Sequence, residues 1–130
     1  MYKTMTANLM VESVDETAEF YCRALGFSIL TSVPKNDGKL QFAILTKDSL
    51  SVMIQDRENL IGEYPVLSTP KVKPSVTLYI TIDNFAELYE ELKCKCDIIC
   101  DVHTTFYGVN EFAIKDNNGY VLTFAENKQL

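Results

Sequence analysis

The feature that most constrains the fold of this chain is an internal repeat whose two copies lie about 70 residues apart. The tripeptide Phe-Ala-Ile at 42–44 recurs at 112–114. A helix-start signature, a capping residue followed three positions later by Glu, occurs at Ser13 and again at Asn84. Because two unrelated kinds of signal agree on one period, we predict two copies of a single strand-helix-strand-strand-strand unit.

The predicted fold class is α+β, with two βαβββ repeats forming a curved mixed sheet around a central cleft. A chain of 130 residues has the size of one domain, and each copy is too short to bury a good core alone. We therefore predict a single domain over 1–130, with repeats at 1–56 and 75–130 and a linker at 57–74. The linker is rich in proline and charge, so we expect it to be the most mobile segment.

The charge balance bears on the partners of the chain. Its 12 basic and 18 acidic residues give a formal net charge of −6, which disfavours nucleic acid and anionic membranes as partners. The sequence contains no apolar run of membrane-spanning length, and its polar start lacks a secretory signal. We therefore expect a cytoplasmic protein.

Hydrophobic periodicity and turn residues predict two helices and eight strands. The first helix starts at Ser13 and ends at Gly26, and the second starts at Asn84. The sequence Asn-Asn-Gly at 117–119 predicts a type I′ turn between the last two strands. The strands are predicted at 5–11, 27–33, 40–46, 50–55, 76–82, 98–102, 109–114 and 120–125.

Alternating side chains assign the strand residues to two sheet faces. An apolar face, expected to pack under the helices, holds Leu9, Val11, Phe42, Ile44, Val52, Ile54, Leu78, Ile80, Ile82, Phe112, Ile114, Leu122 and Phe124. A polar face with small residues at its centre holds Thr6, Asn8, Met10, Gln41, Ala43, Ser51, Met53, Gln55, Thr77, Tyr79, Glu111, Ala113 and Thr123. Such a face is exposed to solvent or wrapped around a ligand, and we favour a ligand cleft because two such sheets are expected to curve towards each other.

Three of the four cysteines lie near the single histidine and allow a zinc site of Cys94, Cys96, Cys100 and His103. The Cys-x-Cys spacing departs from usual zinc motifs, and on an extended strand His103 is expected to point away from the cysteines. We therefore expect reduced, partly buried structural thiols instead, and no disulfide framework in a chain with this much core.

Both copies resemble the glyoxalase and bleomycin-resistance proteins of the vicinal oxygen chelate superfamily. The first copy does so through Phe-Tyr-x3-Leu-Gly-Phe at 20–27 and the residues before it, and the second through 78–84, 88–92, 107–108 and the Asp-x2-Gly turn at 116–119. The resemblance spans the whole chain and implies the fold predicted above. Those motifs belong to the scaffold, so they carry little information about chemistry.

The resemblance also implies where a catalytic metal would be bound. The metal enzymes of the superfamily place His, Gln or Glu at four cleft-facing positions, which correspond here to Thr6, Met53, Thr77 and Thr123, with Ser51 as the alternative to Met53. Hydroxyls and a thioether do not hold a catalytic divalent ion, which needs imidazoles and carboxylates. We therefore predict that this chain has no metal and no other cofactor.

Three hypotheses about function remain. The first is a metal-free small-molecule binding protein that sequesters a drug, as bleomycin-resistance proteins do, and the acidic balance suits a cationic guest. The second is a metal-dependent lyase or dioxygenase of the same superfamily. The third is a metal-free enzyme in which Glu111 is the general base and Tyr79 or Tyr107 donates a proton.

In all three cases the predicted ligand-binding cleft is lined by Thr6, Asn8, Met53, Gln55, Thr77, Tyr79, Glu111 and Thr123. The resembling proteins generally pair, and open sheets leave strand edges that soluble proteins usually cover. We therefore expect a homodimer.

Overall fold

The structure of the protein, a computed structural model, describes residues 1–128. The chain divides into two compact units, Met1–Lys73 and a second that begins at Pro74. Each unit contains one of the predicted repeats and is described by itself. That the two units form a single domain over 1–130 stays a prediction.

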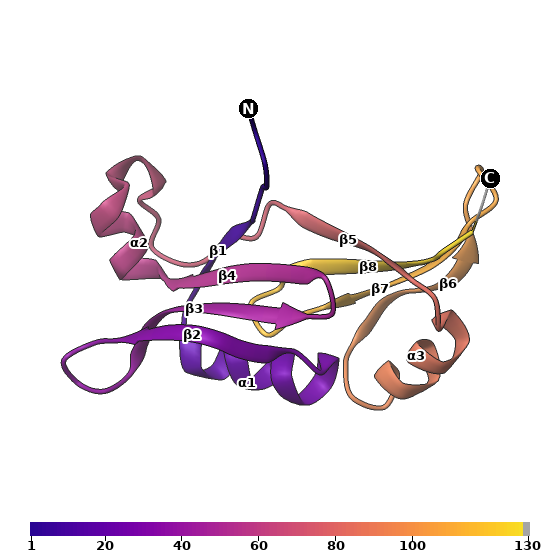
Figure 1. Ribbon diagram of the computed structural model, residues 1–130, viewed down its shortest axis with the longest axis horizontal. Coiled ribbons are helices and arrows are strands. Elements are labelled where there is room, and N and C mark those ends of the chain that lie inside the picture. The colour runs from indigo at the N-terminus through magenta and orange to yellow at the C-terminus, as the bar shows by residue number, and fades with distance from the viewer. Residues whose placement is uncertain (129–130) are drawn as a thin grey trace. The chain divides into compact units, whose positions relative to one another are not determined.

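The first unit is a four-stranded mixed sheet with one helix packed on it (Figure 1). The strands lie in the order β1-β4-β3-β2, with β1 parallel to β4 and the other neighbours antiparallel. The elements are β1 (Asn8–Val11), α1 (Val14–Leu25), β2 (Ser28–Pro34), β3 (Leu40–Lys47) and β4 (Leu50–Asp56).

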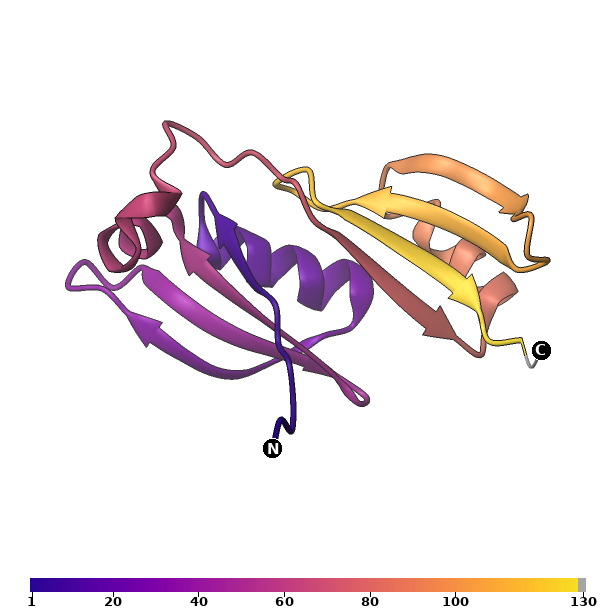
Figure 2. The ribbon, with the colours of Figure 1, turned by 90° about the horizontal axis from the view of Figure 1, so that it is seen from above.

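The second unit repeats this plan, with the strand order β5-β8-β7-β6 and α3 on one face of the sheet (Figure 2). Its elements are β5 (Thr77–Ile82), α3 (Phe85–Leu92), β6 (Ile98–Thr104), β7 (Asn110–Lys115) and β8 (Val121–Glu126). Strand β5 is parallel to β8, as β1 is to β4. The predicted α+β class and the two βαβββ repeats are confirmed.

Local signals explain where the helices begin and end. The Ser13 hydroxyl accepts a hydrogen bond from the Glu16 amide at 3.1 Å, as expected for an N-cap. Gly26 ends α1 with φ 76°, a left-handed conformation that favours glycine. At the start of α3 the prediction is wrong in detail, because the Asn84 side chain makes no capping hydrogen bond.

The core of the second unit is built around Phe112, which is fully buried. Its ring lies 5.4 Å from that of Phe85 and 5.2 Å from that of Tyr89, both on α3, and stacks on Phe124 at 5.3 Å. Phe112 pairs with Phe124 across β7 and β8, and Ile114 pairs with Leu122. The predicted helix-facing side of this sheet is therefore right.

In the first unit, the prediction that Phe42 and Ile44 pack under the helix is wrong. Across β3 and β4, Phe42 pairs with Gln55 and Ile44 pairs with Met53, so both lie on the face opposite the helix. The buried residues of β3 are Ala43 and Leu45. The two Phe-Ala-Ile tripeptides are thus out of structural register by one position, and a shift of one residue moves a side chain to the other face.

The turn between β7 and β8 also differs from the prediction of a type I′ turn. That turn needs positive φ at two central residues, whereas within residues 116–120 only Gly119, with φ 94°, has one. Instead, one carboxylate oxygen of Asp116 accepts hydrogen bonds from the amides of Asn118 at 2.8 Å and Tyr120 at 2.9 Å. A buried Asp side chain thus organises a five-residue loop.

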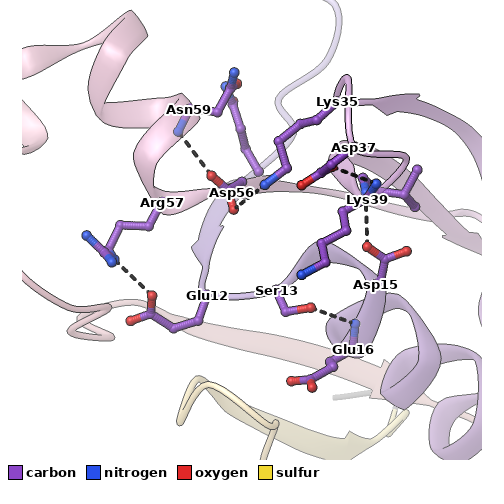
Figure 3. Close-up of polar contacts among 12 residues, drawn as sticks. Glu12, Ser13, Asp15, Glu16, Lys35, Asp37, Lys39, Asp56, Arg57 and Asn59 are labelled. Carbon is purple, nitrogen blue, oxygen red and sulfur yellow. Dashed lines mark hydrogen bonds and ion pairs between the residues drawn. The ribbon is translucent and has the colours of Figure 1, made fainter.

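The stretch expected to be a linker is largely ordered against the first unit. It contains α2 (Arg57–Glu63) and a short 3₁₀ helix, η1 (Pro65–Leu67). The guanidinium of Arg57 donates to the Glu12 carboxylate at 2.8 Å, as Figure 3 shows, and the amide of Val72 donates to the same carboxylate at 2.7 Å. Three prolines and mixed charge signalled a loop, but these contacts hold residues 57–72 against β1.

No helix within residues 1–128 is both long enough and apolar enough to cross a membrane.

Candidate functional site

The most distinctive polar group of the protein is Glu111, on the face of the second sheet that α3 does not cover. Its oxygen Oε2 accepts a hydrogen bond from the Tyr79 hydroxyl at 2.5 Å and another from the Tyr107 hydroxyl at 2.6 Å. The two hydroxyl oxygens lie 3.5 Å apart. Three segments meet here, because Tyr79 lies on β5, Glu111 on β7 and Tyr107 in the turn between β6 and β7.

The Glu111 carboxylate is buried without a cationic partner. Glu111 is only 7% exposed, and within residues 1–128 no Lys, Arg or His lies within ion-pair distance of it. The two tyrosine hydroxyls compensate its charge through charge-assisted hydrogen bonds. The bond to Glu111 raises the pKa of Tyr79 well above its usual range, so this hydroxyl remains a donor at physiological pH.

The other predicted residues of this face surround the cluster without bonding to it. Thr123 lies beside Tyr79 in the parallel pair of β5 and β8, and Thr77 lies beside Val121. Next to Glu111 on β8 is Ala125, whose small side chain leaves the carboxylate room. Besides Val121 and His103, this face presents a carboxylate, phenols, hydroxyls and small residues.

The corresponding face of the first unit carries amides. The Asn8 side chain donates to Oε1 of Gln55 at 2.8 Å, and Nε2 of Gln55 donates to Asn59 at 2.6 Å and to Glu63 at 3.1 Å. Asn59 and Glu63 belong to α2. Gln55 is only 6% exposed, because residues expected to be a linker fold back onto it.

The remaining predicted residues of this unit are Met53 and Thr6. Met53 lies beside Asn8, half-buried, and on the same face as Gln55. Thr6 precedes β1 and is half-buried. The structure therefore brings Asn8, Met53 and Gln55 together within the first unit, and Thr77, Tyr79, Glu111 and Thr123 together within the second.

At the four positions that the resemblance assigns to the superfamily's metal ligands, the side chains do not fit a metal ion. Thr6, Met53, Thr77 and Thr123 offer three hydroxyls and a thioether, whereas a catalytic divalent ion needs imidazole or carboxylate donors. Within residues 1–128, no group of three or more His, Cys, Asp or Glu side chains is arranged to hold a metal ion. Glu111, the one carboxylate among the predicted site residues, binds two hydroxyls instead.

The cysteine-histidine cluster departs from its prediction in two respects. His103 was expected to point away from the cysteines, but the irregular pairing of β6 with β7 between Cys100 and His103 changes its direction. Its Nδ1 lies 3.7 Å from the Cys100 sulfur and 3.0 Å from the Asp101 carbonyl oxygen. All four cysteines are free thiols; Cys94 and Cys100 are exposed, whereas Cys22 and Cys96 are half-buried as expected.

Three residues of these clusters were not among the predicted site residues. Tyr107 was considered only as a proton donor, and Asn59 and Glu63 were assigned to a linker. The aromatic residues beside Gly108 were a usable signal for Tyr107. The signal that could have located Asn59 and Glu63 is weaker: Asp56 is a residue type that often caps helices. Its side chain accepts a hydrogen bond from the Asn59 amide at 3.2 Å and caps α2 (Figure 3).

Comparison with known proteins places the fold in a family. The family model described as Glyoxalase/Bleomycin resistance protein/Dioxygenase superfamily matches residues 4–124. No curated protein matches the chain.

Several solved structures share the fold at low sequence identity. TioX from Micromonospora sp. ML1 is 16% identical, with 98% of this chain and 100% of that chain covered and a TM-score of 0.75. A glyoxalase-related enzyme from Fulvimarina pelagi is 16% identical, with 98% and 89% covered and a TM-score of 0.78. A bleomycin-binding protein in complex with bleomycin is 21% identical, with 98% and 100% covered and a TM-score of 0.68. Together with the two βαβββ repeats, the match over nearly the whole chain shows that this protein belongs to the Glyoxalase/Bleomycin resistance protein/Dioxygenase superfamily.

Proposed function

We propose that the protein is a metal-free binding protein for a small organic molecule, which it sequesters rather than transforms. The ligand lies on the open face of the second sheet, over Tyr79, Glu111 and Thr123, and Tyr107 contributes from the adjoining turn. Thr77 lies on the same face, and for the first unit we propose ligand contacts at Thr6, Asn8, Met53 and Gln55 of its own sheet. The bleomycin complex of a protein with this fold supports it.

The observation that carries the proposal is the carboxylate of Glu111. Burial of a charge without a cationic partner is unfavourable, and such groups are uncommon in parts of a protein that serve packing alone. Two hydroxyls hold this carboxylate in place at 2.5 and 2.6 Å. A few fixed polar groups on an otherwise small-residue surface are typical of small-molecule sites.

The superfamily's metal chemistry is not part of the proposal, because the donor set at its four ligand positions is unsuitable. A lyase or dioxygenase of that kind needs at least one imidazole or carboxylate among Thr6, Met53, Thr77 and Thr123. We expect purified protein to hold much less than one transition metal per chain by elemental analysis. One tightly bound metal per chain would contradict the proposal.

A second candidate is a metal-free enzyme in which Glu111 is the general base. The geometry that favours it is the pair of phenol donors on one carboxylate oxygen, which fixes the position of the other oxygen. The two candidates differ in whether the bound molecule changes. A molecule recovered chemically unaltered after prolonged incubation supports binding, and a molecule converted by the wild type but not by Glu111→Gln supports catalysis.

The proposal is tested with a panel of neutral, anionic and cationic small molecules, with the change in melting temperature as the readout. We expect at least one class to stabilise the wild type, and Glu111→Gln to weaken that binding while leaving the fold intact. Glu87→Gln is the matched control, because it makes the same charge change on the exposed surface of α3. Equal binding by the wild type and Glu111→Gln would place the ligand elsewhere.

The assembly and location of the protein are part of the proposal as well. We propose a homodimer, because each sheet has two edge strands, and β2 and β6 are exposed along most of their length. Nucleic acid and membrane are not among the proposed partners, and the proposed location is the cytoplasm.

A further inference from the structure

The arrangement around Glu111 bears on the kind of molecule that this face accepts. Both tyrosine hydroxyls donate to Oε2, and within residues 1–128 no residue donates to Oε1. In that part of the chain no buried side-chain nitrogen or oxygen lacks a hydrogen-bond partner. Oε1 therefore reaches the surface, where it remains free to accept from a ligand.

The groups beside this carboxylate are aromatic. Tyr79 is 54% exposed and Tyr107 is 45% exposed, although the hydroxyls of both are bound to Glu111. The exposed area therefore belongs largely to their rings. Phe106 is fully exposed and packs edge-on against Tyr107, with ring centroids 5.0 Å apart. Electron-rich rings next to an anion attract organic cations through both the ring quadrupole and the full charge.

The basic groups nearby are already engaged elsewhere. His103 pairs with Glu111 across β6 and β7, but its Nδ1 lies 3.0 Å from the Asp101 carbonyl oxygen. The ammonium of Lys128 donates to the Gly108 carbonyl at 2.9 Å. Neither forms an ion pair with Glu111, so a cationic ligand would supply the missing counter-charge.

We propose that the open face of the second sheet binds a protonated or quaternary alkylamine, with the Glu111 carboxylate as its counter-ion and the rings of Tyr79 and Tyr107 against its alkyl groups. This inference rests on the proposed binding function and names the class of ligand. A neutral molecule can at most donate a hydrogen bond to Glu111 without neutralising its charge, and an anion is repelled by that charge. The alkyl groups on the nitrogen can pack against the tyrosine rings, whereas a metal cation has no such groups.

The test compares choline with its neutral isostere, in which a carbon atom replaces the nitrogen. The two probes have the same shape and differ in charge. Binding to the whole 130-residue chain is followed by NMR chemical-shift changes of amides in β5 and β7. We expect choline to bind at least tenfold more tightly than the isostere, and equal affinities would overturn the inference.

Variants then assign the effect to residues. Glu111→Gln keeps the shape and an acceptor for both hydroxyls, and we expect it to lower choline affinity at least tenfold while the affinity of the isostere stays the same. Glu87→Gln changes the net charge equally and should leave choline binding unchanged. Tyr79→Phe keeps the ring and should retain most of the affinity, whereas Tyr79→Leu should lose several-fold. Undiminished choline binding by Glu111→Gln would refute the inference.

The outcome separates this inference from the broader proposal. If neutral molecules bind over Glu111 and choline does not, the class of ligand is wrong and the binding function stands. If no member of the panel binds, both are wrong. Should Glu111→Gln fail to fold, as judged by circular dichroism, the comparison of choline with its isostere on the wild type still decides the question.

Discussion

At the scale of single residues, the two repeats differ most at one position of the open face. Glu111 on β7 pairs with Ala125 on β8, and the corresponding pair in the first unit is Phe42 with Gln55. The second unit thus has a carboxylate beside a small side chain where the first unit has an aromatic ring beside an amide. The first unit has no carboxylate at this position, so the proposed counter-ion of the ligand lies in the second unit.

Phe42 and Phe112 hold the same place in the repeated tripeptide but lie on different sheet faces. Substituting each of them tests this difference. Phe112 is fully buried among three aromatic rings, so Phe112→Ala should lower the free energy of unfolding by about 3–5 kcal/mol. Phe42 is half-buried on the open face, and Phe42→Ala should lower it by roughly half as much or less. Chemical denaturation measures both. Equal losses would mean that Phe42 belongs to the core after all.

At the scale of elements, α2 is the addition to the repeat plan that most alters a face. Its residues Asn59 and Glu63 bind Gln55, which in turn binds Asn8 of β1. Arg57, at the start of α2, is bound to Glu12 directly after β1. The helix is therefore attached at two places, by a partly buried amide network and by a partly exposed ion pair.

The amide network predicts that Gln55→Ala loosens α2. The variant leaves Asn8 and Asn59 without their partner and should cost about 1–3 kcal/mol. Hydrogen exchange should accelerate at the Tyr64 amide, which donates to the Leu60 carbonyl at 2.8 Å. Ser51→Ala, on the same strand and face but exposed, is the control and should leave this exchange unchanged. Unaltered protection of α2 in Gln55→Ala would show that the amide network does not hold the helix.

The ion pair predicts a dependence on pH. The hydrogen bond from Arg57, and next the one from the Val72 amide, lower the pKa of Glu12 in the folded state. Its contribution is therefore present above the unfolded pKa of about 4.3 and is lost as the pH falls through the folded value. Glu12→Gln should destabilise the protein by no more than about 1 kcal/mol at neutral pH, since the pair is partly exposed. The difference in melting temperature between variant and wild type should vanish in acid, and a constant difference would contradict this account.

At the scale of the whole molecule, the predicted single domain and the predicted homodimer are both open to measurement. The second unit has fewer than about 60 residues, a size at which an isolated core is only marginally stable. We therefore expect the two units to unfold in one transition, so that Phe112→Ala lowers the melting temperature reported by amides of both units. A shift confined to the second unit would mean two independent domains.

The dimer is tested by sedimentation. At concentrations of tens of micromolar, well above ordinary dimer dissociation constants, we expect a single species of twice the chain mass. The mass of one chain is 14.7 kDa. A species of that mass over the whole concentration range would exclude the dimer.

The sequence by itself determined the repeat, the two helices with their approximate ends, the eight strands, and the face of the second sheet that α3 covers. It also determined the residue types at the four metal-ligand positions and picked out Glu111. These properties are local, since they depend on a cap, a turn glycine or an alternation within a few residues.

Only the tertiary structure decided the register of β3, the docking of α2 and the meeting of Tyr79 and Tyr107 at Glu111. In β3, residues 40–46 are apolar on both faces, so alternation could not choose between Phe42 and Ala43; the pairing with β4 chose. Helix α2 is held by side chains of β4 and of Glu12 directly after β1, which lie outside its own stretch of sequence. The two tyrosines are 28 residues apart in the chain, and the order of the strands brings both to one carboxylate oxygen.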